Sequence, residues 1–317
     1  MADTGIPTHE DIVAAHDRIR PWIHRTPVLT SATLDRMSGA ELAFKCENLQ
    51  QAGAFKVRGA GNAVLGLPEA QADAGVATHS SGNHGAALCW AAGRRGIPAT
   101  VVMPEGASRA KVRAVEAYGG TIVTCGPTLE ARERTLAEVT GRTGATFVHP
   151  YDDARVIAGQ ATCAVELHED AGLLDAVVAP VGGGGLVSGT ALALATLAPG
   201  TRIYAAEPAN ADDAHRSLHA GERVAAASPD TIADGLRASL GELTWHVLSR
   251  HVSDVLLLSE ARIVDAMRLV WERMKIVIEP SSAVAVAAVL DNPRLFAGRR
   301  VGVILTGGNV DLDALPW

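Results

Sequence analysis

Short apolar runs alternate with longer segments of helical character along most of the chain. The run at 75–78 leads through a polar turn into the amphipathic segment 86–95, and the same order recurs further on. Comparable apolar runs stand at residues 99–104, 121–125, 145–150, 175–181, 202–208 and 300–305. Strands that alternate with helices of about 10–15 residues are typical of βαβ units, which build a parallel sheet. The runs are almost continuously apolar, as expected for strands with both faces covered.

The chain is long for a single hydrophobic core, so two domains are expected. It has 317 residues, 48% of them hydrophobic, and single cores stop growing at about 250–300 residues. No Pro- or Ser-rich linker divides the sequence, so the boundaries are crossings between lobes near 68–75 and 147–152. We expect an α/β protein of two doubly wound, mostly parallel open sheets. A small domain, residues 72–148, would be inserted into a large domain made of residues 1–71 and 149–317.

Composition and charge narrow the range of partners. The net charge is −7, and no block of basic residues occurs, so neither nucleic acid nor a membrane is expected as a partner. The longest fully apolar run, residues 283–290, is far shorter than the roughly 20 residues that cross a bilayer. The first ten residues do not form a signal peptide. The four cysteines include no CxxC pair, so we expect reduced, partly buried thiols in a cytoplasmic protein.

Four consecutive glycines, Gly182 to Gly185, follow an apolar run and precede a helical segment. Such a turn lets backbone N–H groups approach a phosphate, and the dipole of the following helix adds positive potential. A dinucleotide site fits poorly, because a G-x-G-x-x-G pattern begun at Gly182 or Gly183 would need glycine at Val187 or Ser188. No P-loop motif is present. The loop therefore matches a single phosphate best, with a loose hinge as the alternative.

Three further features would complete a site for a small phosphorylated cofactor. Lys56 stands among small and apolar residues, where it either extends to water or serves as a desolvated amine that forms a Schiff base. Ser80, Ser81 and Asn83 offer polar side chains at a turn that could also simply cap a helix. Thr306 ends the last strand with a hydroxyl, or belongs to an ordinary terminal turn. Together with the glycine loop, these residues describe a site for pyridoxal phosphate.

Five ordered motifs carry a resemblance to a known family. GAFKVRGA, SSGNHG, GGGGL, EPANADD and LTGGNVD are spread over residues 53–311. They resemble, in order, the motifs of the fold-type II pyridoxal phosphate enzymes, whose fold is similar to that of the tryptophan synthase β subunit. Within that family the chain looks like the branch of serine racemases and serine/threonine dehydratases, which includes 3-hydroxyaspartate dehydratases. The resemblance implies pyridoxal phosphate as cofactor, a small β-hydroxy amino acid as substrate, and a homodimer.

The same resemblance assigns the cofactor contacts. Lys56, directly after Phe55, would carry the cofactor as a Schiff base, and Asn83 would hydrogen-bond the phenolic oxygen of its ring. The phosphate would be held by Gly182, Gly183, Gly184, Gly185 and Leu186. Thr306 would face the pyridine nitrogen. A hydroxyl cannot keep this nitrogen protonated as an aspartate can, which favours loss of a β-leaving group over prolonged carbanion chemistry.

The implied reaction uses Lys56 as the base that takes the Cα proton; the β-hydroxyl then leaves, and hydrolysis yields a 2-keto acid and ammonia. Ser81 matches the serine that racemases place on the opposite face of the substrate. Substrate contacts are expected from Ser80, Ser81, Asn83, His84 and Arg132. Arg132 matches an arginine that contacts substrate carboxylates in racemase-like members, which would suit 3-hydroxyaspartate. The alternative is a surface arginine paired with Glu130 or Glu133.

The motif EPANADD resembles the divalent-cation site of the family. Glu207 and Asp213 would supply carboxylates and Ala211 a backbone carbonyl. Oxygen ligands of this kind suit Mg²⁺, or Ca²⁺ or Mn²⁺ in its place. The alternative is a helix N-terminus with solvated acidic residues.

Several positions depart from the pattern of the relatives. Ala54 stands where many have serine, and Ala238 replaces a serine of animal racemases, which leaves the substrate open. Ala86 and Tyr151 stand where animal racemases carry residues for nucleotide activation, so control by ATP is not expected. The chain ends at Trp317, so the regulatory domain of biosynthetic threonine deaminases, and with it isoleucine feedback, is not expected either.

The leading hypothesis is therefore a pyridoxal phosphate-dependent dehydratase that converts L-serine or L-threonine to a 2-keto acid and ammonia. The alternatives within the family are a serine racemase that uses Lys56 and Ser81 as its two bases, and a 3-hydroxyaspartate dehydratase. A non-catalytic protein that binds pyridoxal phosphate is the alternative from a different class.

Overall fold

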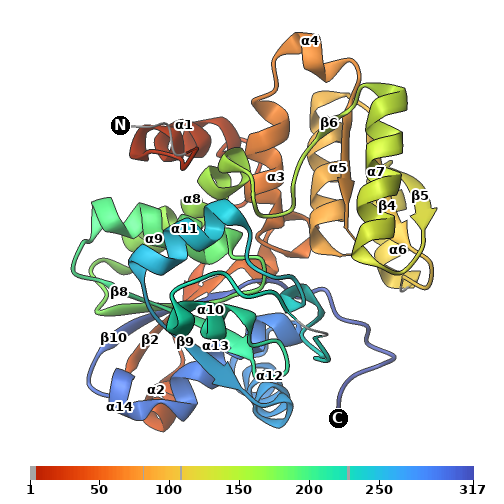
Figure 1. Cartoon of the computed structure of the whole chain (residues 1–317). Helices are drawn as coiled ribbons and strands as arrows, with labels where there is room; N and C mark the ends of the chain where they lie inside the picture. Colours follow the sequence, from red (N-terminus) through yellow and green to blue (C-terminus); the bar gives the residue numbers. More distant parts are fainter. Residues whose placement is uncertain (1–4, 81, 108, 227–228) are drawn as a thin grey trace.

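A computed structural model describes residues 5–80, 82–107, 109–226 and 229–317, and its strands form two sheets (Figure 1). The strands of the larger sheet are β1 (Val28–Leu29), β2 (Glu41–Cys46), β7 (Ala176–Pro180), β8 (Arg202–Pro208), β9 (Val252–Leu258) and β10 (Arg300–Leu305). The strands of the smaller sheet are β3 (Val76–His79), β4 (Ala99–Pro104), β5 (Thr121–Cys125) and β6 (Thr146–Phe147). The strand orders are β1-β2-β10-β7-β8-β9 and β5-β4-β3-β6, and every neighbouring pair is parallel except β1 with β2.

Helices cover the sheets. In the first half of the chain they are α1 (His9–Ile19), α2 (Ala32–Ser38), α3 (Lys56–Leu65), α4 (Glu69–Ala72), α5 (Asn83–Arg95), α6 (Arg109–Ala117), α7 (Leu129–Thr143) and α8 (Ala154–Ala171). In the second half they are α9 (Gly185–Leu197), α10 (Asp213–Ala220), α11 (Glu242–His251), α12 (Glu260–Met274), α13 (Pro280–Asp291) and α14 (Pro293–Phe296). Short 3₁₀ turns are η1 (Glu47–Leu49), η2 (Gln51–Gly53) and η3 (Asp234–Leu236). One apolar cluster joins the larger sheet to α12 and α13, and another joins it to α8, α9 and α11.

The expected α/β class with two mostly parallel sheets is confirmed. Strands β4 to β8 and β10 fall within the predicted apolar runs, and β3 (Val76–His79) extends one residue beyond its predicted run, whereas β1, β2 and β9 were not predicted. Strand β1 is only two residues long and pairs antiparallel with β2, and neither feature leaves a clear periodic signal. All strands of the smaller sheet lie between Val76 and Phe147; the domain limits at 72–148 stay a prediction.

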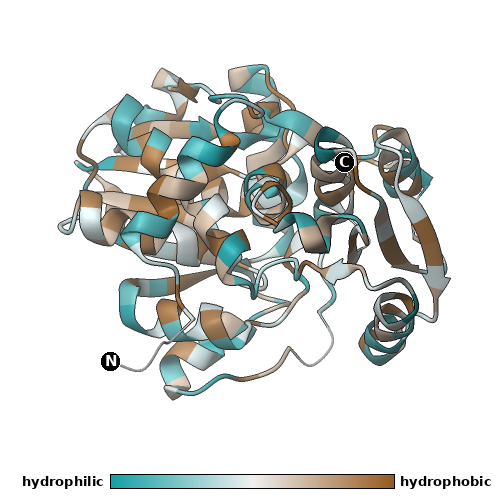
Figure 2. Ribbon diagram, turned by 90° about the horizontal axis from the view of Figure 1, so that it is seen from above, coloured by the Kyte–Doolittle hydropathy of each residue, from teal (hydrophilic) through white to brown (hydrophobic). Residues whose placement is uncertain are grey.

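The apolar run 283–290 lies in α13 and is buried against strands of the larger sheet. Figure 2 shows hydrophobic residues concentrated on the strands and on the helix faces that meet them. Across the described part of the chain, no helix is both long and apolar enough for a membrane crossing.

The predicted free thiols are confirmed, since the four cysteines are unpaired and buried: Cys46, Cys89, Cys125 and Cys163.

The topology brings several strand ends and helix starts to one place. Strand β7 leads through the glycine loop into α9, and β3 leads through the polar turn into α5. An isolated bridge joins Ala54 to Gly307, beyond the end of β10, and the Phe55 N–H donates to the Thr306 carbonyl at 2.9 Å. Lys56 at the start of α3 is thereby held beside the end of β10. In open parallel sheets, ligands bind at such carboxyl ends of strands.

Candidate active site

The glycine loop between β7 and α9 is a surface made of backbone alone. A Cβ at Gly183 would overlap the ring of Tyr151, and a Cβ at Gly182 would lie 2.9 Å from the Leu236 Cα. Gly184 has φ +91°, a left-handed conformation that side chains disfavour. Only glycine fits at these positions, and this glycine cradle leads directly into the N-terminus of α9, whose first N–H groups have no partner within the helix. The loop therefore fits a phosphate group.

Lys56 is half-buried, and among the described residues its side chain hydrogen-bonds to one backbone carbonyl. Its ammonium donates to the Pro150 carbonyl at 2.8 Å and lies 5.1 Å from the ring centroid of Phe55. Burial lowers the pKa of Lys56 to about 8, although the Glu279 carboxylate opposes the shift. A larger share of the amine is consequently neutral near physiological pH than in an exposed lysine. Desolvation of this kind is what a Schiff-base lysine requires.

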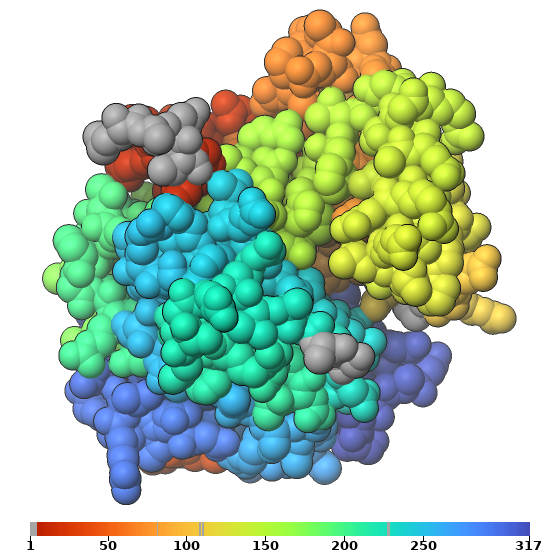
Figure 3. All heavy atoms as spheres, in the orientation of Figure 1, coloured from red at the N-terminus to blue at the C-terminus, as the bar shows by residue number. Residues whose placement is uncertain are grey.

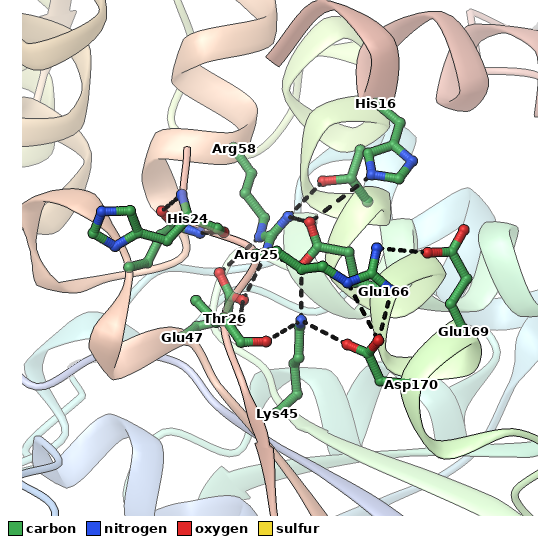
Figure 4. A network of polar contacts seen from close by, with 12 residues as sticks. His16, His24, Arg25, Thr26, Lys45, Glu47, Arg58, Glu166, Glu169 and Asp170 are labelled. Carbon is green, nitrogen blue, oxygen red and sulfur yellow. Dashed lines mark hydrogen bonds and ion pairs between the residues drawn. The ribbon is translucent and has the colours of Figure 1, made fainter. Parts of the chain in front are cut away.

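A buried ionic network holds the helix that begins with Lys56 (Figure 4). Arg58 donates to both carboxylate oxygens of Glu47, at 2.7 and 2.8 Å, and to both oxygens of Glu166, at 2.9 and 2.7 Å. Lys45 donates to Glu166 at 2.7 Å and to the Thr26 carbonyl at 2.8 Å. Paired guanidinium–carboxylate contacts are strong and directional. Arg58, two residues after Lys56, therefore anchors the first turn of α3 to α8 and η1.

These contacts govern the ionisation of the network. Burial acts to lower the pKa of Arg58, but Glu47 and Glu166 outweigh it and raise that pKa well above its usual value. Burial likewise acts to raise the pKa of Glu166, but Arg58 and Lys45 lower it. The contacts within the network therefore favour the charged forms of Arg58 and Glu166.

Asn83 is oriented by two residues that the sequence did not single out. Its amide nitrogen donates to the two Glu279 oxygens at 2.9 and 3.1 Å, and its amide oxygen accepts from Asn309 at 2.9 Å. Burial raises the pKa of Glu279 to about 8. Glu279 immediately precedes α13, where no periodic pattern separates it from an ordinary surface acid. Only the fold shows that this carboxyl is buried beside Asn83.

Thr306 is buried at the end of β10, and its hydroxyl lies 3.0 Å from the Ser282 hydroxyl. The Ser282 oxygen also lies 2.7 Å from the Gly307 carbonyl and accepts from the Gly307 N–H at 2.8 Å. Ser282, which the sequence did not indicate, thus connects the Thr306 side chain to the turn that follows it. A neutral hydroxyl at this position is compatible with the predicted contact to a pyridine nitrogen, and that contact stays a prediction.

The other residues predicted in the polar turn are Ser80, Ser81 and His84, and the contacts of Ser80 and His84 differ. The Ser80 hydroxyl accepts from the Gly82 and Gly85 N–H groups, each at 3.2 Å, and so stabilises the turn itself. His84 is buried, with its Nε2 3.3 Å from the Val148 carbonyl, and burial holds its pKa well below the usual value. Ser81 lies outside the described residues, so its predicted role stays a prediction.

A group of cationic and imidazole side chains lies on the small-sheet side. The rings of His79 and His149 are 6.0 Å apart, and His149 accepts through Nδ1 from the Asp152 N–H at 2.8 Å. Burial, reinforced by His79, lowers the pKa of His149 to about 4. His149 is therefore neutral with its proton on Nε2. Arg132 is half-buried, and its Nε finds no hydrogen-bond partner among the residues that the structure describes.

The contacts around Arg132 argue against the alternative hypothesis of a surface arginine paired with Glu130. A Glu130 carboxylate oxygen lies 4.0 Å from the Arg134 guanidinium, one turn away. Within the described part of the chain, the Arg132 side chain donates to the Pro127 carbonyl at 3.3 Å. Arg132 thus retains an unfulfilled donor. Figure 3 shows the surface hollowed where α6 and α7 face the segment after α10. An ion pair between Lys111 and Asp234 joins these two segments.

The predicted cation ligands lie together between β8 and α10. Glu207 accepts from the His215 N–H at 2.7 Å, and Asp213 accepts from the Leu240 N–H at 3.2 Å. Burial, reinforced by Asp213, raises the pKa of Glu207 to about 9, and burial raises that of Asp213 to about 6. Ala211 is buried in the same turn. Two buried carboxyls whose pKa values are raised by burial fit a divalent cation, whose positive charge would favour their ionised forms.

Known proteins resemble this chain along nearly its whole length. The sequence profile of the family described as pyridoxal-phosphate dependent enzyme matches residues 19–307. A β-hydroxyaspartate dehydratase of Paracoccus denitrificans is 60% identical over 98% of this chain and 99% of that protein. A serine racemase of Arabidopsis thaliana is 51% identical over 96% of this chain and 93% of that protein. The structure of maize serine racemase superposes with a TM-score of 0.94 at 44% identity, covering 97% of this chain and 95% of that one. The chain therefore belongs to the fold-type II pyridoxal phosphate-dependent enzymes, among their dehydratases and racemases.

Proposed function

We propose that this protein is a dehydratase that converts 3-hydroxyaspartate to oxaloacetate and ammonia. The observation that carries the proposal is the similarity, over almost the whole of both chains, to the β-hydroxyaspartate dehydratase of Paracoccus denitrificans. Serine and threonine, the substrates that the sequence placed first, become the second choice.

The residues around Lys56 fit pyridoxal phosphate. The glycine cradle and the N-terminus of α9 suit its phosphate, the buried Thr306 hydroxyl suits its ring nitrogen, and the lowered pKa of Lys56 suits its aldehyde. Phe55 and Leu186 flank the lysine and the loop, and Asn83 is held in place by Glu279. When bound, the cofactor supplies an electron sink that makes the Cα–H of an amino acid acidic.

The chain's own groups then carry the proton transfers. Lys56, freed as a neutral amine, takes the Cα proton, and the β-hydroxyl leaves as water after taking up a proton. One water molecule then hydrolyses the product to the 2-keto acid and ammonia. The Cα–H and Cβ–O bonds break in the elimination, and the hydrolysis breaks the Cα–N bond and forms the keto C=O. One water is lost and one is consumed, and no external oxidant or reductant is needed.

Arg132 and His149 are proposed to bind the second carboxylate that distinguishes 3-hydroxyaspartate from serine. The support is the unfulfilled Nε donor of Arg132 and the neutral His149 ring, whose Nε2–H is left to donate because Nδ1 already accepts. A guanidinium forms paired hydrogen bonds with a carboxylate more readily than an ammonium does. The substrate's distal carboxylate would thus meet one charged and one neutral donor.

A substrate panel tests this proposal. The holoenzyme is assayed with 3-hydroxyaspartate, serine and threonine, and keto acid and D-isomer are measured separately. We expect the highest kcat/KM for keto acid from 3-hydroxyaspartate. Arg132→Gln should lower that kcat/KM by about 10–100-fold, the usual effect of losing a hydrogen bond to a charged group, and should change serine turnover much less.

The exposed Arg134, which lies on the same helix, provides the matched control. Arg134→Gln should change the kcat/KM for each substrate by less than about twofold, since exposed ion pairs contribute little. Equal losses for serine and 3-hydroxyaspartate in Arg132→Gln would count against a distal-carboxylate role. A higher kcat/KM for serine or threonine than for 3-hydroxyaspartate would overturn the substrate assignment.

Racemisation is the second activity to be scored, because serine racemases are also similar to this chain. Lys56 and Ser81 would act from opposite faces of Cα. Ser81→Ala should then abolish D-isomer formation while much dehydration of the L-isomer remains.

The proposal is completed by Mg²⁺ at Glu207 and Asp213, a homodimer, and a cytoplasmic location. Sedimentation of the purified protein tests the dimer.

A further inference from the structure

Two histidines on consecutive turns of α10 face a carboxylate of β9. His215 and His219 are four residues apart, and one ligand atom from each of them and from Asp254 lies within 4.8 Å of the others. The imidazole rings stack with their centroids 4.1 Å apart and their planes 34° apart. His215 and Asp254 are half-buried and His219 is exposed. The cluster is separate from the site around Lys56 and plays no part in the reaction proposed above.

Backbone contacts determine which nitrogen of each ring is left for a ligand. The His215 Nδ1 lies 2.7 Å from the Val255 carbonyl, and the His219 Nδ1 lies 2.9 Å from the His215 carbonyl. A carbonyl only accepts hydrogen bonds, so both Nδ1 atoms carry the proton and both Nε2 atoms carry a lone pair. Metal-binding histidines characteristically donate their other N–H in this way, which holds the ring in place.

A backbone hydrogen bond likewise orients the carboxylate of Asp254. One oxygen of Asp254 accepts from the Val255 N–H at 2.8 Å, which orients the group and leaves the other oxygen available. Val255 thus holds two ligands at once, His215 through its carbonyl and Asp254 through its N–H. Strand β9 and helix α10 therefore present the three groups together.

We propose that His215, His219 and Asp254 bind a divalent transition-metal ion of the zinc type. Two imidazole nitrogens at i and i+4 of a helix plus one carboxylate form a common three-ligand set for Zn²⁺, with water as the fourth ligand. Imidazole ligands select such ions over Mg²⁺ and Ca²⁺, which take oxygen ligands. The site is thus chemically distinct from the carboxylates of Glu207 and Asp213.

The position of the site couples it to that pair of carboxylates. The His215 N–H donates to the Glu207 carboxylate at 2.7 Å, so one residue belongs to both places. An ion that bridges α10 and β9 fixes the helix whose first residue is Asp213. Occupancy is therefore expected to raise the melting temperature of the protein.

Titration with Co²⁺, a spectroscopic substitute for Zn²⁺, tests the proposal. Untagged holoenzyme is kept in excess Mg²⁺, which competes with the added ion for the oxygen-ligand site. We expect one equivalent of Co²⁺ to produce visible d–d bands at longer wavelength than the cofactor absorption, and Zn²⁺ to abolish them. His219→Gln and Asp254→Asn should each weaken Zn²⁺ binding by at least about 10-fold, the loss typical even of an outer-shell partner.

The exposed His24, remote in sequence from α10 and β9, supplies the control, and His24→Gln should bind Co²⁺ like the parent protein. Because the His219 side chain is exposed, its replacement is not expected to disturb folding, and circular dichroism checks this. Absence of d–d bands in the parent protein overturns the proposal. So do bands that persist unchanged in His219→Gln and Asp254→Asn.

Discussion

Glu166→Gln would test the buried ionic network beneath Lys56. Glu166 accepts two hydrogen bonds from Arg58 and one from Lys45, all between 2.7 and 2.9 Å, and its side chain is 3% exposed. Glutamine keeps the shape of the side chain but removes its negative charge. Lys45 and Arg58 would then keep the buried carboxylate of Glu47 and the partly exposed carboxylate of Asp170, which lies 3.9 Å from the Lys45 ammonium. The buried positive charge would therefore be compensated less completely.

The cost of this change can be estimated from that imbalance. Removing one partner of a buried ion pair costs about 3–5 kcal/mol of unfolding free energy, because the remaining charge cannot regain water. At about 2.1 cal/mol/K of unfolding entropy per residue, a chain of this size loses roughly 5–8 °C of melting temperature. The shift also depends on pH. The pKa of Glu166 is lowered in the folded state, so its contribution is fully present above the unfolded value of about 4.3 and is lost as pH falls through the folded value.

The assay is thermal unfolding of the parent and variant holoenzymes by circular dichroism, at neutral pH and along a descending series of pH values that passes below the folded pKa of Glu166. Glu169→Gln is the matched control, since Glu169 lies on the same helix and pairs with Arg25 at the surface, where both side chains are about half exposed. For this control we expect the free energy of unfolding to change by less than about 1 kcal/mol. Equal shifts in the two variants would refute the reasoning, as would a Glu166→Gln deficit that does not shrink at low pH.

Three further predictions concern the cofactor and the cation. Gly183→Ala should lower retention of pyridoxal phosphate after dialysis, read from its absorbance, because the added methyl group overlaps Tyr151, whereas Gly200→Ala, with nothing within 4 Å, should retain it. Apoenzyme should rebind the cofactor faster as pH rises toward about 8 and level off above it, because only the neutral Lys56 amine forms a Schiff base; a flat pH profile in stopped-flow absorbance would contradict this. Chelation of divalent cations should lower the melting temperature and kcat of the parent protein but not of Glu207→Gln, and an identical response in both would exclude Glu207 as a ligand.

The sequence predicted the parts of the site that have strong local signatures. The glycine run, Lys56 in a small and apolar setting, and the polar turn at Asn83 are each recognisable within a few residues. Their alternation with apolar runs also predicted the parallel sheets that place strand ends together. Strand β1 escaped prediction because it is only two residues long, and β2 and β9 escaped it because their short patterns do not differ from those of other apolar segments.

Other site residues acquire their character only from their surroundings. Glu279 and Ser282 lie near the start of α13 and look ordinary in the sequence, yet the fold buries them beside Asn83 and Thr306. Arg132 could equally have been a surface residue, and only packing shows that its neighbour Glu130 faces Arg134 instead.

By itself, the sequence determined the α/β class and the family, and it singled out Lys56 as the candidate Schiff-base lysine, because these depend on local patterns of backbone freedom and side-chain type. The tertiary structure alone decided which charges are buried and which groups meet across the chain. Arg58 illustrates the difference. In the sequence it is a cation two residues from Lys56; in the fold it is fully buried between Glu47 and Glu166. Desolvation and ion pairing depend on distances between residues far apart in the chain, and these distances exist only once the chain has folded.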